Sequence, residues 1–231
     1  MPTIRATLVF LIALILPAAP VPGEEEGDAA REAAFEFLAK VEEKHKETTS
    51  LQAEFVQLRE DTVFLEEVRS EGRFWWRSPD LFRASLRSEH DSEIWIRDGK
   101  MYEYIPDLRQ VDVVEQPEGE DAPLHQWLLG FGAKVEEIEK HFNVRMLPEA
   151  EEAGWVAIEF LPREDGRSFE FEEIVIHFHE EDVEPRQIVL DDGLSIITIE
   201  LRRVRVNPSI RDSVFRLDWP DNVDVVDRSR L

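Results

Sequence analysis

The sequence predicts an α+β fold in which helices cover one face of a large antiparallel sheet. Three observations lead to this prediction: one helical stripe near the N-terminus, a long series of segments with alternating apolar and polar residues, and two Asp-Gly pairs that each separate two such segments. Many consecutive antiparallel strands form either a large curved sheet or a barrel. The helices must then bury their apolar stripes against one face of that sheet.

Residues 1–23 have the features of a secretory signal peptide. Arg5 supplies positive charge, an apolar run of ten residues extends from Thr7 to Leu16, and small residues follow up to Gly23. The run is shorter than the roughly 20 residues of a membrane-spanning helix, so an uncleaved anchor is the less favoured alternative. We therefore expect cleavage near Gly23 and a mature protein that works outside the cytoplasm.

The mature chain is expected to begin with a short acidic tether, residues 24–28, followed by a single domain over residues 29–231. A helix is predicted from Asp28, as its N-cap, to about Glu47. Its apolar stripe has the spacing i, i+3, i+4 and i+7, and consists of Ala34, Phe37, Leu38 and Val41. No later stretch resembles a linker between domains.

From Leu51 onward the apolar period changes to two, which is typical of strands that bury one face. Alternation predicts strands around residues 51–55, 72–76, 82–86, 94–96, 174–178 and 197–201. Asp98-Gly99 and Asp192-Gly193 fit the turns of tight hairpins. Two short helical stripes interrupt the strands. One lies between Pro123 and Gly130 and contains Leu124, Trp127 and Leu128, and the other consists of Val135, Ile138 and Phe142.

Composition excludes several classes of function. The chain has 27 Lys plus Arg against 51 Asp plus Glu, a net charge of −24, which argues against binding nucleic acid or anionic lipid surfaces. It has no cysteine, so disulfides, thiol catalysis and cysteine metal sites are absent.

No nucleophile, phosphate-binding or zinc-protease motif is present, so we expect neither enzymatic activity nor a cofactor. His177 and His179 would share one strand face, but no third ligand has a matching spacing, so no metal site is predicted.

The aromatic content leaves two interpretations open. The chain has 14 Phe and 6 Trp, and Phe74-Trp75-Trp76 places rings on both faces of one strand. The rings could fill a heavy core between the sheet and the helices. They could instead line an apolar cavity that holds lipid chains, since each buried methylene contributes roughly 0.8 kcal/mol.

Four segments resemble the LolA family of periplasmic lipoprotein carriers. They are Leu51–Gln57, Gly72–Arg83, Asp98–Val111 and Asn207–Val226, and their order and spacing extend the resemblance over nearly the whole mature chain. The resemblance implies an unclosed antiparallel barrel, or half-barrel, with helices forming a lid over its concave face. It also implies a non-catalytic carrier, expected to be a monomer. The carrier takes the acyl chains of lipoproteins from an inner-membrane ABC transporter, through the periplasm, to an outer-membrane acceptor.

The resemblance also assigns candidate lipid-binding residues. The positions that match the family's concave face are Leu51, Phe55, Phe74, Trp76, Phe82 and Ala84, and Trp127 and Leu128 fall in the lid-like helix. The family's lid-latching arginine before proline is replaced here by Ser78. Arg77 precedes it by one residue, and we expect it on the opposite face of the strand. The alternative function is an envelope sensor or protein-interaction module of the same fold, with a filled core.

Overall fold

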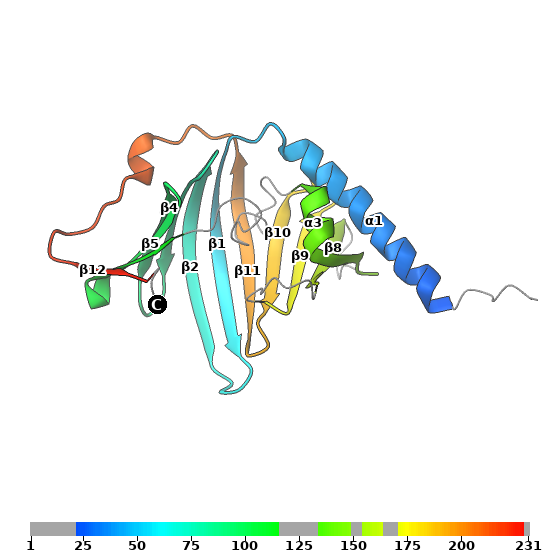
Figure 1. Cartoon of the computed structure of the whole chain (residues 1–231), viewed down its shortest axis with the longest axis horizontal. Coiled ribbons are helices and arrows are strands. Elements are labelled where there is room, and N and C mark those ends of the chain that lie inside the picture. The colour runs from blue at the N-terminus through cyan, green and yellow to red at the C-terminus, as the bar shows by residue number, and fades with distance from the viewer. Residues whose placement is uncertain (1–21, 116–133, 149–153, 164–170, 229–231) are drawn as a thin grey trace, which may run out of the picture.

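The computed structural model describes residues 22–115, 134–148, 154–163 and 171–228, and it shows an α+β fold (Figure 1). Within these residues, two α-helices accompany one sheet of twelve strands. The helices are α1 (Pro22–His45) and α3 (Val135–His141), and two short 3-10 helices are η1 (Pro106–Leu108) and η3 (Asp212–Phe215). The strands are β1 (Ser50–Asp61), β2 (Glu67–Arg77), β3 (Leu81–Arg87), β4 (Ser92–Arg97), β5 (Lys100–Ile105), β6 (Gln110–Glu115), β7 (Phe142–Met146), β8 (Trp155–Pro162), β9 (Glu173–His179), β10 (Pro185–Asp191), β11 (Ser195–Val206) and β12 (Asp224–Asp227).

The sheet is unclosed and almost entirely antiparallel, which confirms the predicted fold class. Its strand order is β12-β6-β5-β4-β3-β2-β1-β11-β10-β9-β8-β7, so β12 and β7 are the two edges. Only β12 runs parallel to its neighbour, β6. β1 and β11, separated by most of the chain, pair at the centre through the register that joins Leu51 to Val206 and Asp61 to Ser195.

Both Asp-Gly pairs form the predicted turns. Asp98 and Gly99 join β4 to β5 with φ angles of 52° and 70°, the left-handed values that a two-residue hairpin turn requires. In the turn between β10 and β11, Gly193 has a φ of 80°. The Oδ1 atom of Asp192 accepts hydrogen bonds there from the backbone N–H groups of Leu194 (2.9 Å) and Ser195 (2.6 Å).

The predicted start of the first helix is wrong. α1 begins at Pro22 rather than Asp28, so the expected tether, residues 24–28, is helical. Glutamate has a high helix propensity, and acidic residues favour the first turn of a helix, where they interact with its dipole.

The second predicted stripe is also one residue too long. α3 ends at His141, and Phe142 is extended (φ −128°) as the first residue of β7. Residues 1–21 of the predicted signal peptide and the helix expected between Pro123 and Gly130 lie outside the described residues, and Pro22 and Gly23 belong to α1.

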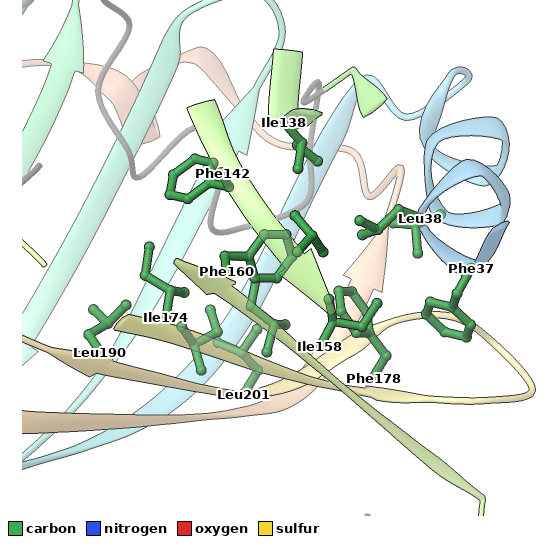
Figure 2. Close-up of a cluster of buried hydrophobic side chains, with 14 of the residues drawn as sticks. Phe37, Leu38, Ile138, Phe142, Ile158, Phe160, Ile174, Phe178, Leu190 and Leu201 are labelled. Carbon is green, nitrogen blue, oxygen red and sulfur yellow. The ribbon is translucent and has the colours of Figure 1, made fainter. Parts of the chain in front are cut away.

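One apolar core joins the helices to one face of the sheet, which we call the inner face. Figure 2 shows side chains of α1 and α3 gathered over strands β7 to β11. Phe37 of α1 contacts Phe178 of β9, with ring centroids 5.4 Å apart, and Phe142 meets Phe160 edge to face at 6.1 Å. Phe178, Ile158 and Ile174 are almost completely buried. This end of the inner face is therefore filled by the protein's own side chains.

The C-terminal segment packs on the opposite, outer face. After β11 the chain runs to η3 and then to β12, at the edge of the sheet opposite to β7 (Figure 1). Trp219 lies against Trp95 and Tyr102, with ring centroids 5.8 and 6.0 Å apart. Phe215 and Trp95 are buried, so the outer face has an apolar layer of its own under residues 208–220. No helix among the described residues is both long and apolar enough to cross a bilayer.

Candidate functional site: an apolar wall on the inner face

Six of the eight predicted lipid-binding residues lie together on the inner face. Across β1, β2 and β3, Leu51 lies opposite Trp76, and Trp76 lies opposite Phe82, which forms one row of side chains. In the next row, Phe74 of β2 lies opposite Ala84 of β3. Phe55 lies one row further along, opposite Gly72. Because alternate residues of a strand point to the same face, the pairs form one continuous surface over β1, β2 and β3. We call this surface the apolar wall: Leu51, Phe55, Phe74, Trp76, Phe82 and Ala84.

The residues of the apolar wall differ in how deeply they are buried. Leu51, Phe55, Phe74 and Ala84 are buried, whereas Trp76 and Phe82 are half-buried. Phe74 and Phe82 stack with ring centroids 5.9 Å apart and an interplanar angle of 21°. Leu86 of β3 and Ile94 of β4 extend the apolar surface toward the β12 edge, and both are also only partly buried. The wall therefore has a packed base and an outer margin that keeps some contact with solvent.

The described helices lie over the other half of the sheet. α1 contacts β7 and α3, at the edge opposite to β12 (Figure 1). Trp127 and Leu128, the two residues expected in the lid-like helix, lie outside the described residues, so their placement stays a prediction.

Three residues of α1 make polar contacts that fix the helix in this position. Arg31 donates a hydrogen bond to Glu139 of α3 at 2.6 Å. Glu42 accepts one at 3.0 Å from the backbone N–H of Val135, the first residue of α3. At the end of α1, Lys44 donates to the carbonyl oxygen of Asp182 and lies 3.6 Å from Glu184.

Burial raises the pKa of the Glu184 carboxyl, and the Lys44 ammonium opposes this shift. The ion pair thus stabilises the charged form of a carboxyl that burial would otherwise neutralise.

Arg77 contacts the C-terminal segment of the chain. As expected from strand alternation, its side chain lies on the outer face. Its Nη1 donates to Asp212 Oδ1 at 2.7 Å and to the carbonyl oxygen of Ile210 at 3.4 Å, and its guanidinium lies 5.0 Å from the Phe215 ring centroid. Ser78 is exposed, and its backbone N–H donates to the carbonyl oxygen of Thr49. Arg77 therefore holds the C-terminal segment on the outer face, and the role of position 78 in a lid stays a prediction.

The outer face carries a cleft of about 340 Å³ with a different chemistry. Its walls include Glu54, Glu71, Arg73, Arg87 and Arg202, with Trp75 and Ser85 between them. Arg73 donates to Glu54 at 2.6 Å, and this hydrogen bond lowers the pKa of the Glu54 carboxyl. An acyl chain would have to desolvate these charges, so the outer cleft is unsuited to hydrocarbon.

Beside this cleft, an arginine side chain packs against two tryptophan rings, an arrangement that was not predicted from the sequence. The Arg83 guanidinium lies 5.6 Å from the ring centroid of Trp75 and 5.3 Å from that of Trp95, and it donates two hydrogen bonds to Glu93. The signal was present in the sequence, because the two tryptophans alternate with the inner-face residues of β2 and β4.

His177 and His179 lie in β9 with Val175, in the alternate positions to the buried Ile174, Ile176 and Phe178. No group of three or more metal-ligating side chains occurs in the part of the chain that the structure describes.

The fold is thus an unclosed antiparallel sheet with helices over one half of its inner face and an apolar wall on the other half. The family model of the outer membrane lipoprotein carrier protein LolA matches residues 46–218. The chain therefore belongs to the LolA family, whose members are periplasmic carriers and not enzymes. This confirms the resemblance and the expectation of a non-catalytic protein.

Curated relatives agree with this assignment. The chain is 29% identical over 228 residues to an outer-membrane lipoprotein carrier protein of Alkalilimnicola ehrlichii, covering 97% of this chain and 96% of that protein. It is 28% identical over 190 residues to one of Halorhodospira halophila, covering 81% and 84%.

Among solved structures, an uncharacterized conserved protein from Thermus thermophilus matches with a TM-score of 0.53 and 17% identity, over 85% of this chain and 99% of that one. At that identity the match shows a shared fold alone.

Proposed function

We propose that the protein is exported to the periplasm, binds the acyl chains of lipoproteins on its apolar wall and carries them from the inner to the outer membrane. The single observation that carries the proposal is the partly buried margin of the wall. Trp76 and Phe82 form a continuous apolar surface with buried neighbours, yet they keep contact with solvent. An acyl chain laid along this margin would bury both rings further.

The energetics favour hydrocarbon as the ligand. Burying the methylenes of a 16-carbon chain contributes on the order of 10 kcal/mol before the costs of association. The wall residues themselves have no ionisable group, so none of them has to be neutralised or paired when the chain binds. Trp127 and Leu128 are proposed to cover the bound chain from the side of the helices.

The route follows from the family. We propose that an inner-membrane ABC transporter delivers the lipoprotein and that an outer-membrane acceptor receives it. Residues 1–23 would direct export and be removed near Gly23, and the carrier would act as a monomer.

The test is acyl binding by the full chain after export. We expect native mass spectrometry of the purified protein to detect bound acyl chains, and a fluorescent fatty acid to bind and be displaced by palmitate. Phe82→Glu should weaken binding of the probe at least tenfold, because it places a charge on the margin of the wall. Leu108→Glu is the matched control, since Leu108 is an exposed residue of η1.

Two further measurements keep the test decisive. Circular dichroism reports whether Phe82→Glu folds, and Phe82→Ser replaces it if it does not. A wild-type protein that binds neither endogenous acyl chains nor the probe would overturn the proposal. If such a protein formed a stoichiometric complex with another envelope protein, the alternative of an interaction module with a filled core would be favoured.

A further inference from the structure

The long hairpin between β1 and β2 ends in a group of exposed apolar side chains. In the described residues, nine large apolar side chains are exposed, and five of them lie at this end of the molecule. We call these five the hairpin tip: Val63, Phe64, Leu65, Val68 and Leu194. Phe64 is 75% exposed and Leu65 is 87% exposed. Figure 1 shows the hairpin projecting beyond the neighbouring strands, with the turn between β10 and β11 beside it.

Hydrogen bonds accepted by the side chain of Asp61 and donated by that of Thr62, and a hydrogen bond between backbone groups, hold the hairpin tip. Asp61 Oδ1 accepts hydrogen bonds from the N–H groups of Val63 (2.9 Å) and Phe64 (2.7 Å). The backbone N–H and the hydroxyl of Thr62 both donate to the carbonyl oxygen of Leu194, at 2.9 and 2.8 Å. Leu65 adopts a left-handed φ of 56°, a conformation that is unfavourable for a bulky side chain. The fold thus holds apolar side chains in water where a turn of polar residues would suffice.

Acidic residues surround the hairpin tip. Residues 59–69 contain four acidic residues, Glu60, Asp61, Glu66 and Glu67, against two basic residues, Arg59 and Arg69. The carboxylates of Glu60, Glu66 and Glu67 form no ion pair with any described residue. In the adjacent turn, Asp192 lies 3.9 Å from Arg59. The surface is therefore an apolar centre with a negatively charged rim.

We propose that the hairpin tip docks into an apolar pocket of a protein partner whose rim is basic. Exposed apolar clusters of this kind mark interaction surfaces, and a large apolar anchor inside a charged rim is the arrangement found at many interfaces. Opposite charges on the two rims would steer the encounter and select the partner.

A bilayer is the less suitable occupant. Anionic lipids repel the acidic rim, and burying Phe64 and Leu65 in lipid would draw Glu66 and Glu67 into the headgroup layer. The small size of the tip indicates a transient contact, because stable protein interfaces bury far more surface. The docking surface is separate from the apolar wall, so this inference does not rest on acyl binding.

Photo-crosslinking from the tip tests the inference. A photoreactive amino acid at position 64 of the full chain, produced in its own cell envelope, should crosslink one protein that the same amino acid at position 108 does not reach. That protein is then purified, and its affinity for the unlabelled full chain is measured by calorimetry.

Two variants of the hairpin tip test its chemistry. We expect Phe64→Ser with Leu65→Ser to weaken binding at least tenfold. Glu66→Lys with Glu67→Lys should weaken it several-fold and reduce its dependence on salt. Leu108→Ser is the matched control, since it removes an equally exposed leucine elsewhere and should leave affinity unchanged.

Three outcomes would overturn the inference. The first is crosslinking that is the same from positions 64 and 108, or that is absent from position 64. The second is a crosslinked protein whose purified form binds both tip variants as tightly as the wild type. The third is co-sedimentation with vesicles of phosphatidylethanolamine and phosphatidylglycerol that is lost in the Phe64→Ser, Leu65→Ser variant, because this would identify the bilayer as the occupant. Loss of fatty-acid binding in the same protein would bear on the acyl carrier proposal alone.

Discussion

Gly72 shows how one residue shapes the apolar wall. It is the register partner of Phe55, whose ring lies directly over the glycine. A Cβ atom at position 72 would lie 2.6 Å from Phe55 Cζ and 2.2 Å from the backbone oxygen of Ser85. Neither distance is tolerated by real atoms, and the Ser85 oxygen belongs to the paired strand β3. Both β3 and the Phe55 ring would therefore have to move.

We predict that Gly72→Ala lowers the free energy of unfolding by about 1–3 kcal/mol, the usual cost of overpacking. The measurement is urea denaturation followed by tryptophan fluorescence. Gly27→Ala is the control, since Gly27 lies inside α1 and the added methyl would meet no described atom within 4 Å beyond its chain neighbours and the backbone of its own helix. There alanine should stabilise by up to about 1 kcal/mol. Equal midpoints for Gly72→Ala and wild type would show that the close approach is not real.

Much of the apolar wall could be predicted at the level of single residues. Alternation places Leu51, Phe55, Phe74 and Trp76 on one face of their strands, and the structure confirms that they share it. Their degree of burial could not be predicted. Whether Phe82 is covered depends on which half of the sheet the helices occupy, and the apolar stripe of α1 would fit either half.

At the scale of elements, several strands with one buried face were predicted, but β7, β8 and β12 were not. β7 alternates cleanly and was missed because its first residue, Phe142, also continues the apolar stripe of α3. β8 contains four consecutive buried residues, Ala157 to Phe160, so its alternation is hidden. The burial of Glu159 is explained by Arg145 of β7, which donates two hydrogen bonds to its carboxylate. β12 also escaped prediction, because its four residues are held by parallel pairing with β6 and are mostly exposed.

The attachment of the C-terminal segment to β2 gives a prediction at this scale. Arg77 contacts Asp212, Ile210 and Phe215, and Asp212 is largely exposed, so the ion pair itself contributes little. We expect Arg77→Ala to cost about 1 kcal/mol, mainly through lost packing over the Phe215 ring. Hydrogen exchange should become faster in residues 208–215.

Hydrogen exchange in Arg77→Ala also distinguishes attachment of the C-terminal segment from a role as a lid latch. α1 should exchange at the wild-type rate in Arg77→Ala, because no described contact joins Arg77 to α1. Arg211→Ala is the control, since Arg211 is exposed and forms no ion pair with the described residues. Faster exchange in α1 with no change in residues 208–215 would mean that Arg77 acts on the helix after all.

At the scale of the whole molecule, the charge balance sets how the fold responds to salt. Ion pairs such as Arg31–Glu139 and Arg202–Glu200 are exposed, and each contributes roughly 0–1 kcal/mol. Even if all 27 basic residues were paired, 24 of the 51 acidic residues would have no basic partner, and the self-repulsion of this net charge of −24 opposes the compact state. Salt weakens both the exposed ion pairs and the self-repulsion of the net charge, but each exposed pair contributes little, whereas the net charge of −24 acts on the whole molecule.

We therefore predict that sodium chloride stabilises the protein. Raising its concentration from 0.05 to 0.5 M at pH 7 shortens the Debye length from about 14 to about 4 Å, and we expect the thermal unfolding midpoint to rise by a few degrees. At pH 5, where carboxyl groups begin to bind protons, the same addition should have a smaller effect, because less negative charge remains to be screened. A midpoint that falls with salt at pH 7 would mean that the exposed ion pairs, and not the acidic excess, dominate the electrostatics of this carrier.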